Sequence, residues 1–270
     1  MTIDWKKYVD KIYCIQYIFN KDRTEKLNTE LFRVDILQSG IYEVIEQFPS
    51  PLYDILFKHF NDISNGEDPK RYFNSFIGHY SAIKKAYLNN CNNVLILEDD
   101  CRFLKDKSQM IYLLDNAIPK FIEIIDKPAI FGGSISHSIN QIDAGINYDS
   151  NNLYTITEFN NRDFYYGAGA AFTIYNRKAM ESLINFVENL NYAIIDQYNI
   201  IYPPETQYIL LNKHICLQQD WLFMMYNTCN DYNMLQPSDE ELEQKKNWGA
   251  PFNRDTIKIY NDIKKYFHMN

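Results

Sequence analysis

Three consecutive acidic residues, Glu98, Asp99 and Asp100, follow directly after the apolar run from Val94 to Leu97. Carboxylates this close together repel one another, and a bound cation relieves that repulsion. Oxygen ligands suit Mg²⁺ or Mn²⁺, which keep coordination positions free for substrate phosphates. Because alternate side chains of an extended backbone lie on the same side, we expect Glu98 and Asp100 to hold the metal, directly or through water. A solvated acidic turn remains the alternative.

A helix and a strand must position these acids. The helix is predicted from residues that recur at helical spacing on one face, namely His79, Ala82, Ile83, Ala86 and Tyr87. Asparagines between positions 89 and 93 end it, and the strand 94–97 follows. In parallel α/β sheets, ligands bind at the carboxyl ends of the strands, which is where the acids lie.

The rest of the chain repeats this alternation of strands and helices. Further strands are predicted at 11–19, 31–37, 128–131, 153–159 and 165–175, helices from about position 20 and at 109–115, 120–125 and 178–190, and loops at Pro49, Pro51 and 64–69. Such alternation indicates an α/β fold with a mainly parallel, Rossmann-like sheet covered by helices on both sides. We expect a single domain over residues 1–270, in which residues 236–270 form a C-terminal extension with a closing helix at 255–267.

Composition excludes several classes of function. The net charge of −8 argues against a nucleic-acid partner and against a polybasic membrane surface. No signal peptide and no run long enough to span a membrane is predicted, which favours a cytoplasmic protein. The five cysteines have no metal-ligand spacing and fit reduced thiols.

The block Gly78–Ala86 followed by Val94–Asp100 resembles glycosyltransferase family 25, which includes bacterial lipooligosaccharide galactosyltransferases and collagen galactosyltransferases. The interval between His79 and Asp100 is the one this family has. Weaker matches follow the family's order: Cys14–Tyr17 with Asp22 and Arg23, Tyr166–Ile174 with Ala179 and Leu183, Ile195–Tyr198, and Ile215–Gln219. The chain departs from the family at Gly78, where Ser is usual, and at Gln16, where Asn is usual.

The resemblance implies a GT-A type fold that holds a UDP-sugar, usually with Mn²⁺. It implies transfer of galactose or glucose to a hydroxyl of a glycan or glycosylated acceptor, as in lipopolysaccharide biosynthesis. Inverting chemistry needs one general base to deprotonate the acceptor hydroxyl. The family's Val-Asp step makes Asp196 that candidate, with a helix N-cap as the alternative.

Donor-binding roles are assigned by the same resemblance and by position. The candidates are Gln16, Arg23, His79, Asp99, Gly132, Gly133, Gly167 and Gln219, with His137, Gly169, Gln218 and Asp220 nearby in sequence and His214 as a further metal partner. Arg23 is suited to a two-pronged contact with diphosphate oxygens and is otherwise a surface residue. His79 lies on the apolar stripe, so a core histidine is the alternative. The glycines either admit a ligand close to the backbone or mark a bulge.

Two other functions compete with this hypothesis. A phosphodiesterase or nuclease can use the same acids with a divalent metal, although the negative charge of the chain disfavours a polyanionic substrate. The other is a non-catalytic member of the same fold that binds a sugar or a partner protein, and the departures at Gly78 and Gln16 leave it open.

Overall fold

The computed structural model describes residues 1–16, 21–46, 69–104, 106–133, 154–158, 171–188, 206–211 and 215–218. The strands are β1 (Lys11–Gln16), β2 (Tyr42–Glu46), β3 (Asn93–Glu98), β4 (Cys101–Phe103), β5 (Ala129–Gly132), β6 (Tyr154–Glu158), β7 (Phe172–Asn176), β8 (Gln207–Leu211) and β9 (Cys216–Gln218). The helices are the short 3₁₀ helix η1 (Trp5–Lys7) and the α-helices α1 (Lys21–Arg33), α3 (Pro69–Leu88), α4 (Lys107–Ile122) and α6 (Arg177–Glu188).

A seven-stranded sheet forms the centre of the molecule, in the order β2-β1-β3-β7-β5-β8-β6. Strands β2, β1 and β3 are parallel, and β5 is parallel to β8. Strand β7 runs antiparallel to both of its neighbours, and β6 runs antiparallel to β8. The prediction of a mainly parallel α/β sheet is therefore confirmed, and the arrangement is compatible with a Rossmann-like fold. A separate antiparallel pair joins β4 to β9.

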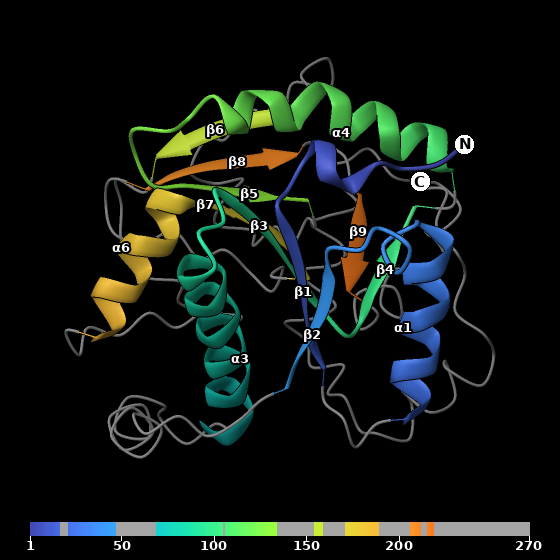
Figure 1. The fold of residues 1–270 in the computed structure, drawn as a ribbon, viewed down its shortest axis with the longest axis horizontal. Helices are drawn as coiled ribbons and strands as arrows, with labels where there is room; N and C mark the ends of the chain where they lie inside the picture. The colour runs from blue at the N-terminus through green and yellow to red at the C-terminus, as the bar shows by residue number, and fades with distance from the viewer. Residues whose placement is uncertain are drawn as a thin grey trace, which may run out of the picture.

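Helices cover both faces of this sheet. Ile12 and Cys14 of β1 and Leu95 of β3 belong to one buried cluster. Because alternate residues of a strand point the same way, Ile12 and Cys14 lie on the same face of the sheet. That cluster also contains residues of α1 and α4, among them Leu27, Leu31, Met110, Leu113, Leu114 and Ala117. Helices α3 and α6 contact each other and the central strands, and Figure 1 shows them side by side, apart from α4.

The prediction of a strand at residues 31–37 is wrong. Residues 31–33 complete α1, and a turn follows in which Asp35 has a left-handed φ of 63°. Leu27, Leu31 and Val34 are buried at helical spacing, a period that outweighs the preference of Val and Ile for strands. In addition, the indole of Trp5 donates to the carbonyl of Val34 at 2.7 Å.

Strand β2 was not predicted. It lies at the edge of the sheet, and Tyr42, Glu43 and Val44 are all partly exposed. Edge strands of this kind lack the continuous apolar run that marks a central strand. Its pairing with β1 nevertheless fixes the register of the predicted first strand, from Ile12 opposite Tyr42 to Gln16 opposite Glu46.

Most other predicted elements are present with shifted bounds. The helix before the acids extends back to Pro69, and Asn90 follows it with a left-handed φ of 57°. The helical patterns predicted at 109–115 and 120–125 belong to one helix, α4, which includes Pro119. The segments 165–170 and 236–270 lie outside the described residues. Within the described ranges, no helix is both long and apolar enough to cross a membrane.

Candidate functional site

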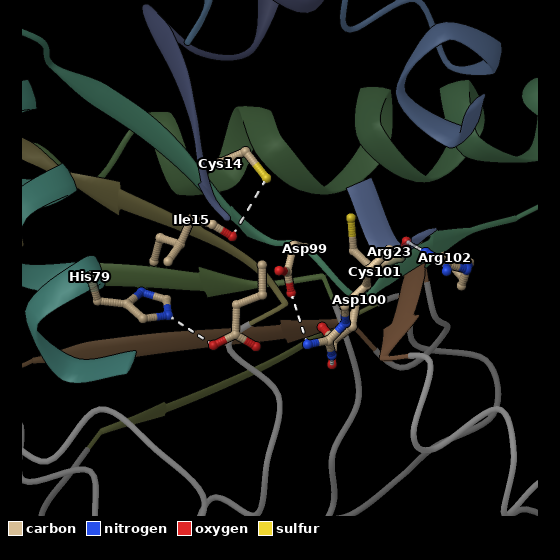
Figure 2. A network of polar contacts seen from close by, with 9 residues as sticks. Cys14, Ile15, Arg23, His79, Asp99, Asp100, Cys101 and Arg102 are labelled. Atoms are coloured by element: carbon tan, nitrogen blue, oxygen red, sulfur yellow. Dashed lines mark hydrogen bonds and ion pairs between the residues drawn. The ribbon is translucent and has the colours of Figure 1, made fainter. Parts of the chain in front are cut away.

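The acidic residues lie at the carboxyl edge of the sheet, where β3 ends at Glu98. Asp99 and Asp100 form a turn, after which the chain continues as β4. Because the turn interrupts the extended backbone, the alternation expected for Glu98 and Asp100 stops at Glu98. Figure 2 shows Arg23 together with Asp99 and Asp100, and His79 apart from them. Both aspartates are buried, with exposures of 7% and 6%.

Arg23 bridges the two aspartates. Its Nη1 lies 3.2 Å from Oδ1 of Asp99, and its Nη2 lies 2.9 Å from Oδ2 of Asp100. Burial lowers the pKa of Arg23, but the carboxylates of Asp100, Asp99 and Glu98 together outweigh it and raise that pKa. The guanidinium is therefore a permanent positive charge at the end of β3. Arg23 is thus paired with buried acids, although its own side chain stays 27% exposed.

His79 contacts the remaining acid. Its Nε2 lies 3.1 Å from Oε1 of Glu98, and its ring is completely buried under the sheet edge. Its Nδ1 is buried without a hydrogen-bond partner among the described residues. The helical stripe thus places His79 against the sheet, as expected for a core histidine, and also against the first acid. It orients Glu98, which sequence reasoning had treated as a metal ligand alone.

Asp100 is the most perturbed acid of the group. Burial raises its pKa, the charges of Glu98 and Asp99 raise it further, and Arg23 and Arg102 oppose them, so that the pKa is about 6. Its Oδ1 is buried and accepts no hydrogen bond from any residue that the structure describes. A buried carboxylate oxygen without a partner is costly, and such an oxygen is a ready ligand for a cation.

Helix α1 is tied to the same segment at its other end. Glu30 is buried and its Oε2 accepts from Nη2 of Arg33 at 2.6 Å and from the backbone N–H of Phe103 at 3.0 Å. Arg33 also donates to the carbonyls of Phe103 and Leu104 at 2.9 and 2.7 Å. These contacts fix β4 and hence the turn before it. Sequence reasoning missed them, although a Glu and an Arg three positions apart on a helix are a recognisable pair.

Buried thiols lie beside the acids. Cys14, Cys101 and Cys216 come from β1, β4 and β9, and all three are fully buried and form no disulfide. Burial raises the pKa of Cys14 and of Cys216, and the neighbouring Cys101 raises both further. The thiols of Cys14 and Cys216 are therefore protonated packing groups.

Gln16 and Gly133 are also at this edge, and the structure gives each a packing role. Nε2 of Gln16 donates to the Tyr42 hydroxyl at 3.2 Å. A Cβ at Gly133 would lie 2.4 Å from the ring of Phe172, and its backbone N–H donates to the carbonyl of Phe172 at 3.0 Å. The carbonyl of Gly133 accepts from Ile215 at 2.9 Å. Gly133 thus joins β7 to the segment before β9, while Gly132 ends β5 beside it.

The predicted metal site can be tested on these residues. Asp100 offers an unpartnered buried oxygen, but Arg23 already contacts both aspartates and His79 contacts Glu98. Among the described residues, no group of three or more His, Cys, Asp or Glu side chains is arranged to hold a metal ion. As arranged, these residues offer a cation one unpartnered oxygen, Oδ1 of Asp100, and Oδ2 of the same carboxylate becomes available only when Arg23 gives up its contact.

Several predicted site residues lie outside the described part of the chain. They are Asp196, Gly167, Gln219, His137, Gly169, His214 and Asp220. Gln218 ends β9, opposite Cys101. Of the donor-binding and metal candidates that are described, the structure brings Arg23, His79, Glu98, Asp99 and Asp100 into one connected cluster.

No family model and no curated protein matches this chain.

Proposed function

We propose that this protein is a metal-dependent glycosyltransferase of GT-A type that transfers a hexose, galactose or glucose, from a UDP-sugar to a hydroxyl of a glycan or glycosylated acceptor. The observation that carries the proposal is Asp100, a buried carboxylate at the carboxyl end of a parallel strand with one oxygen unpartnered among the described residues. Ligand sites of open α/β sheets lie at this edge. The resemblance of the segment Gly78–Asp100 to glycosyltransferase family 25 supports the choice of substrate.

Asp100 and Glu98 are the residues that would hold Mn²⁺ or Mg²⁺, with Asp99 beside them. When bound, such an ion supplies Lewis-acid stabilisation of the departing diphosphate. Arg23 provides a planar donor pair suited to diphosphate oxygens. His79 orients Glu98 from the buried side, and Asp196 remains the proposed general base.

A panel of UDP-sugars incubated with the protein and Mn²⁺ tests the proposal. We expect slow UDP release from UDP-galactose or UDP-glucose, and loss of that release in Asp100→Ala. Absence of both UDP release and a thermal shift with every nucleotide sugar in the panel would contradict the proposal.

A non-catalytic binding protein of the same fold is the second candidate. It is favoured by the contacts of Arg23, which already neutralise much of the charge of Asp99 and Asp100. This candidate predicts a thermal shift with a sugar or nucleotide ligand, no UDP release, and equal behaviour of the wild type with and without Mn²⁺.

A further inference from the structure

We propose that Arg23 is an internal counter-cation of the acidic site, which a divalent metal ion displaces from Asp100 and which then becomes available to a diphosphate. The first half of the proposal concerns only Arg23 and the acids. The second half rests on the proposed function, because it requires a nucleotide diphosphate as ligand.

Arg23 is held between two carboxylates, as a bound cation would be. One guanidinium spans two carboxylates, at 3.2 Å from Asp99 and 2.9 Å from Asp100. The acids are nearly inaccessible, whereas the Arg23 side chain is 27% exposed. The acids are therefore fixed and the cation lies on the accessible side, so it is the arginine that can leave.

The bonds that Arg23 makes to Asp99 and Asp100 are side-chain bonds only, and that makes exchange feasible. Neither of these two ion pairs is a backbone hydrogen bond of β3 or of β4, so both can be broken by a rotation of the Arg23 side chain. Asp100 meanwhile keeps a buried Oδ1 with no hydrogen-bond partner in the described ranges. An incoming cation therefore finds one vacant oxygen at once and gains Oδ2 when Arg23 moves.

The charge of the cluster favours this exchange. Among the described residues, the charges of Arg23 and Arg102 lower the pKa of Asp100, and those of Glu98 and Asp99 raise it. Arg102 is buried and its Nη1 donates to the carbonyl of Cys101 at 2.9 Å. Within this group of five side chains, the three carboxylates exceed the two guanidiniums by one charge, and replacing Arg23 by a divalent ion makes the group neutral.

The exchange also couples metal and diphosphate. A displaced Arg23 is a planar hydrogen-bond donor at the same edge of the sheet. An arginine can make bidentate contacts to phosphate oxygens, which a lysine cannot. Removing Arg23 should therefore strengthen the binding of the metal alone and weaken the binding of the nucleotide. An ion pair that stayed closed could also weaken metal binding through its charge, but removing it would leave the nucleotide affinity unchanged.

Isothermal titration of the full chain with MnCl₂ alone tests the first half. We expect Arg23→Gln to bind Mn²⁺ about tenfold more tightly than the wild type, because the competing cation is gone. Arg23→Lys, which keeps the charge but cannot bridge both acids in the same way, should lie between them. Lys178→Gln is the matched control: it removes one positive charge from an exposed pair with Glu181 and should leave the Mn²⁺ affinity unchanged.

Mn²⁺ affinity in Arg23→Gln that is equal to or weaker than that of the wild type would overturn the proposal. If Arg23→Gln does not fold, the comparison of Arg23→Lys with the wild type decides in the same way.

UDP titrated at saturating Mn²⁺ tests the second half, and Arg23→Gln should weaken UDP binding at least about fivefold. Unchanged UDP affinity would overturn that half. A wild type that binds Mn²⁺ but no UDP counts against the proposed function and leaves the Mn²⁺ comparison valid.

Discussion

Each end of helix α1 has an arginine–carboxylate link that contacts the segment 99–104, and the two links differ in what satisfies the carboxylate. At the carboxyl end of the helix, Glu30 accepts from Arg33 and from the backbone N–H of Phe103. At the amino end, Arg23 contacts Asp99 and Asp100 through side chains, and Oδ1 of Asp100 has no partner among the described residues. Both links place charge against the same segment of the chain.

The difference indicates which link can change. A backbone partner cannot leave without breaking β4, so the Glu30 link is permanent and holds the turn in place. A side-chain partner can rotate away, so the Arg23 link can be exchanged for a ligand. The same residue types therefore serve as a fixed support at one end of the helix and as a site at the other.

The largest expected effect is on catalytic activity, and it concerns the Arg23 link and not the Glu30 link. Asp100→Asn should lower UDP release from the preferred UDP-hexose by at least about 100-fold, because a neutral amide is a poor ligand for a divalent cation. Initial rates at saturating Mn²⁺ measure it, with Asp115→Asn, a change of the same type on α4, as the control. Activity within tenfold of the wild type would remove Asp100 from the site.

Glu30→Gln should act on stability instead. We expect the free energy of unfolding to fall by about 2–4 kcal/mol, because the change leaves the Arg33 charge without its carboxylate in a half-buried position. Urea denaturation measures it. Glu25→Gln, an exposed change on the same helix, should cost less than about 0.5 kcal/mol. If both variants had the same stability, the Glu30 link would not be the support described above.

The pH dependence of stability should distinguish Asp100 from an ordinary acid. Its pKa in the folded protein is about 6, above its usual value of 3.8. An acid whose pKa is raised by folding favours the folded state at low pH, and that contribution disappears as the pH rises through 6. Metal-free Asp100→Asn should therefore be more stable than the wild type by about 1–3 kcal/mol at pH 8, and the difference should shrink as the pH falls towards 4. A difference independent of pH would contradict the raised pKa.

The smallest effect is expected at an exposed pair of α4. Lys120 lies 3.7 Å from Glu123, and both side chains are more than half exposed. Lys120→Gln should change the free energy of unfolding by less than about 0.5 kcal/mol, because water screens such pairs. Thermal unfolding measures it and gives the baseline against which the Glu30 change is judged. A loss as large as that of Glu30→Gln would mean that surface pairs matter as much as the buried link.

The order of helices and strands was largely predictable, because apolar periodicity follows directly from burial. Apolar periodicity identified α3 and β3, and it therefore placed His79 and the acids at one edge of the sheet. Periodicity carries no information on strand direction, which is why the antiparallel β7 could not be foreseen. At residues 31–37, β-branched residues suggested a strand, although Leu27, Leu31 and Val34 already followed the helical period.

The acids themselves were predictable, whereas their partners were not. An acidic run after a buried strand is visible in the sequence, and so is Arg23 near the first strand. The sequence does not show that the turn at Asp99 and Asp100 directs both side chains to Arg23, because that depends on how α1 packs against β4. The alternation expected for Glu98 and Asp100 applied only as far as the backbone stayed extended.

Gly133 and Phe172 restrict how this sequence can diverge. Since any Cβ at position 133 would collide with the aromatic ring at 172, a descendant of this chain can replace the glycine only after the ring has been replaced by a smaller side chain. The two positions should therefore covary among distant relatives, with glycine at the first wherever an aromatic residue occupies the second. Such a pair of positions offers a way to recognise relatives whose overall sequence similarity has been lost.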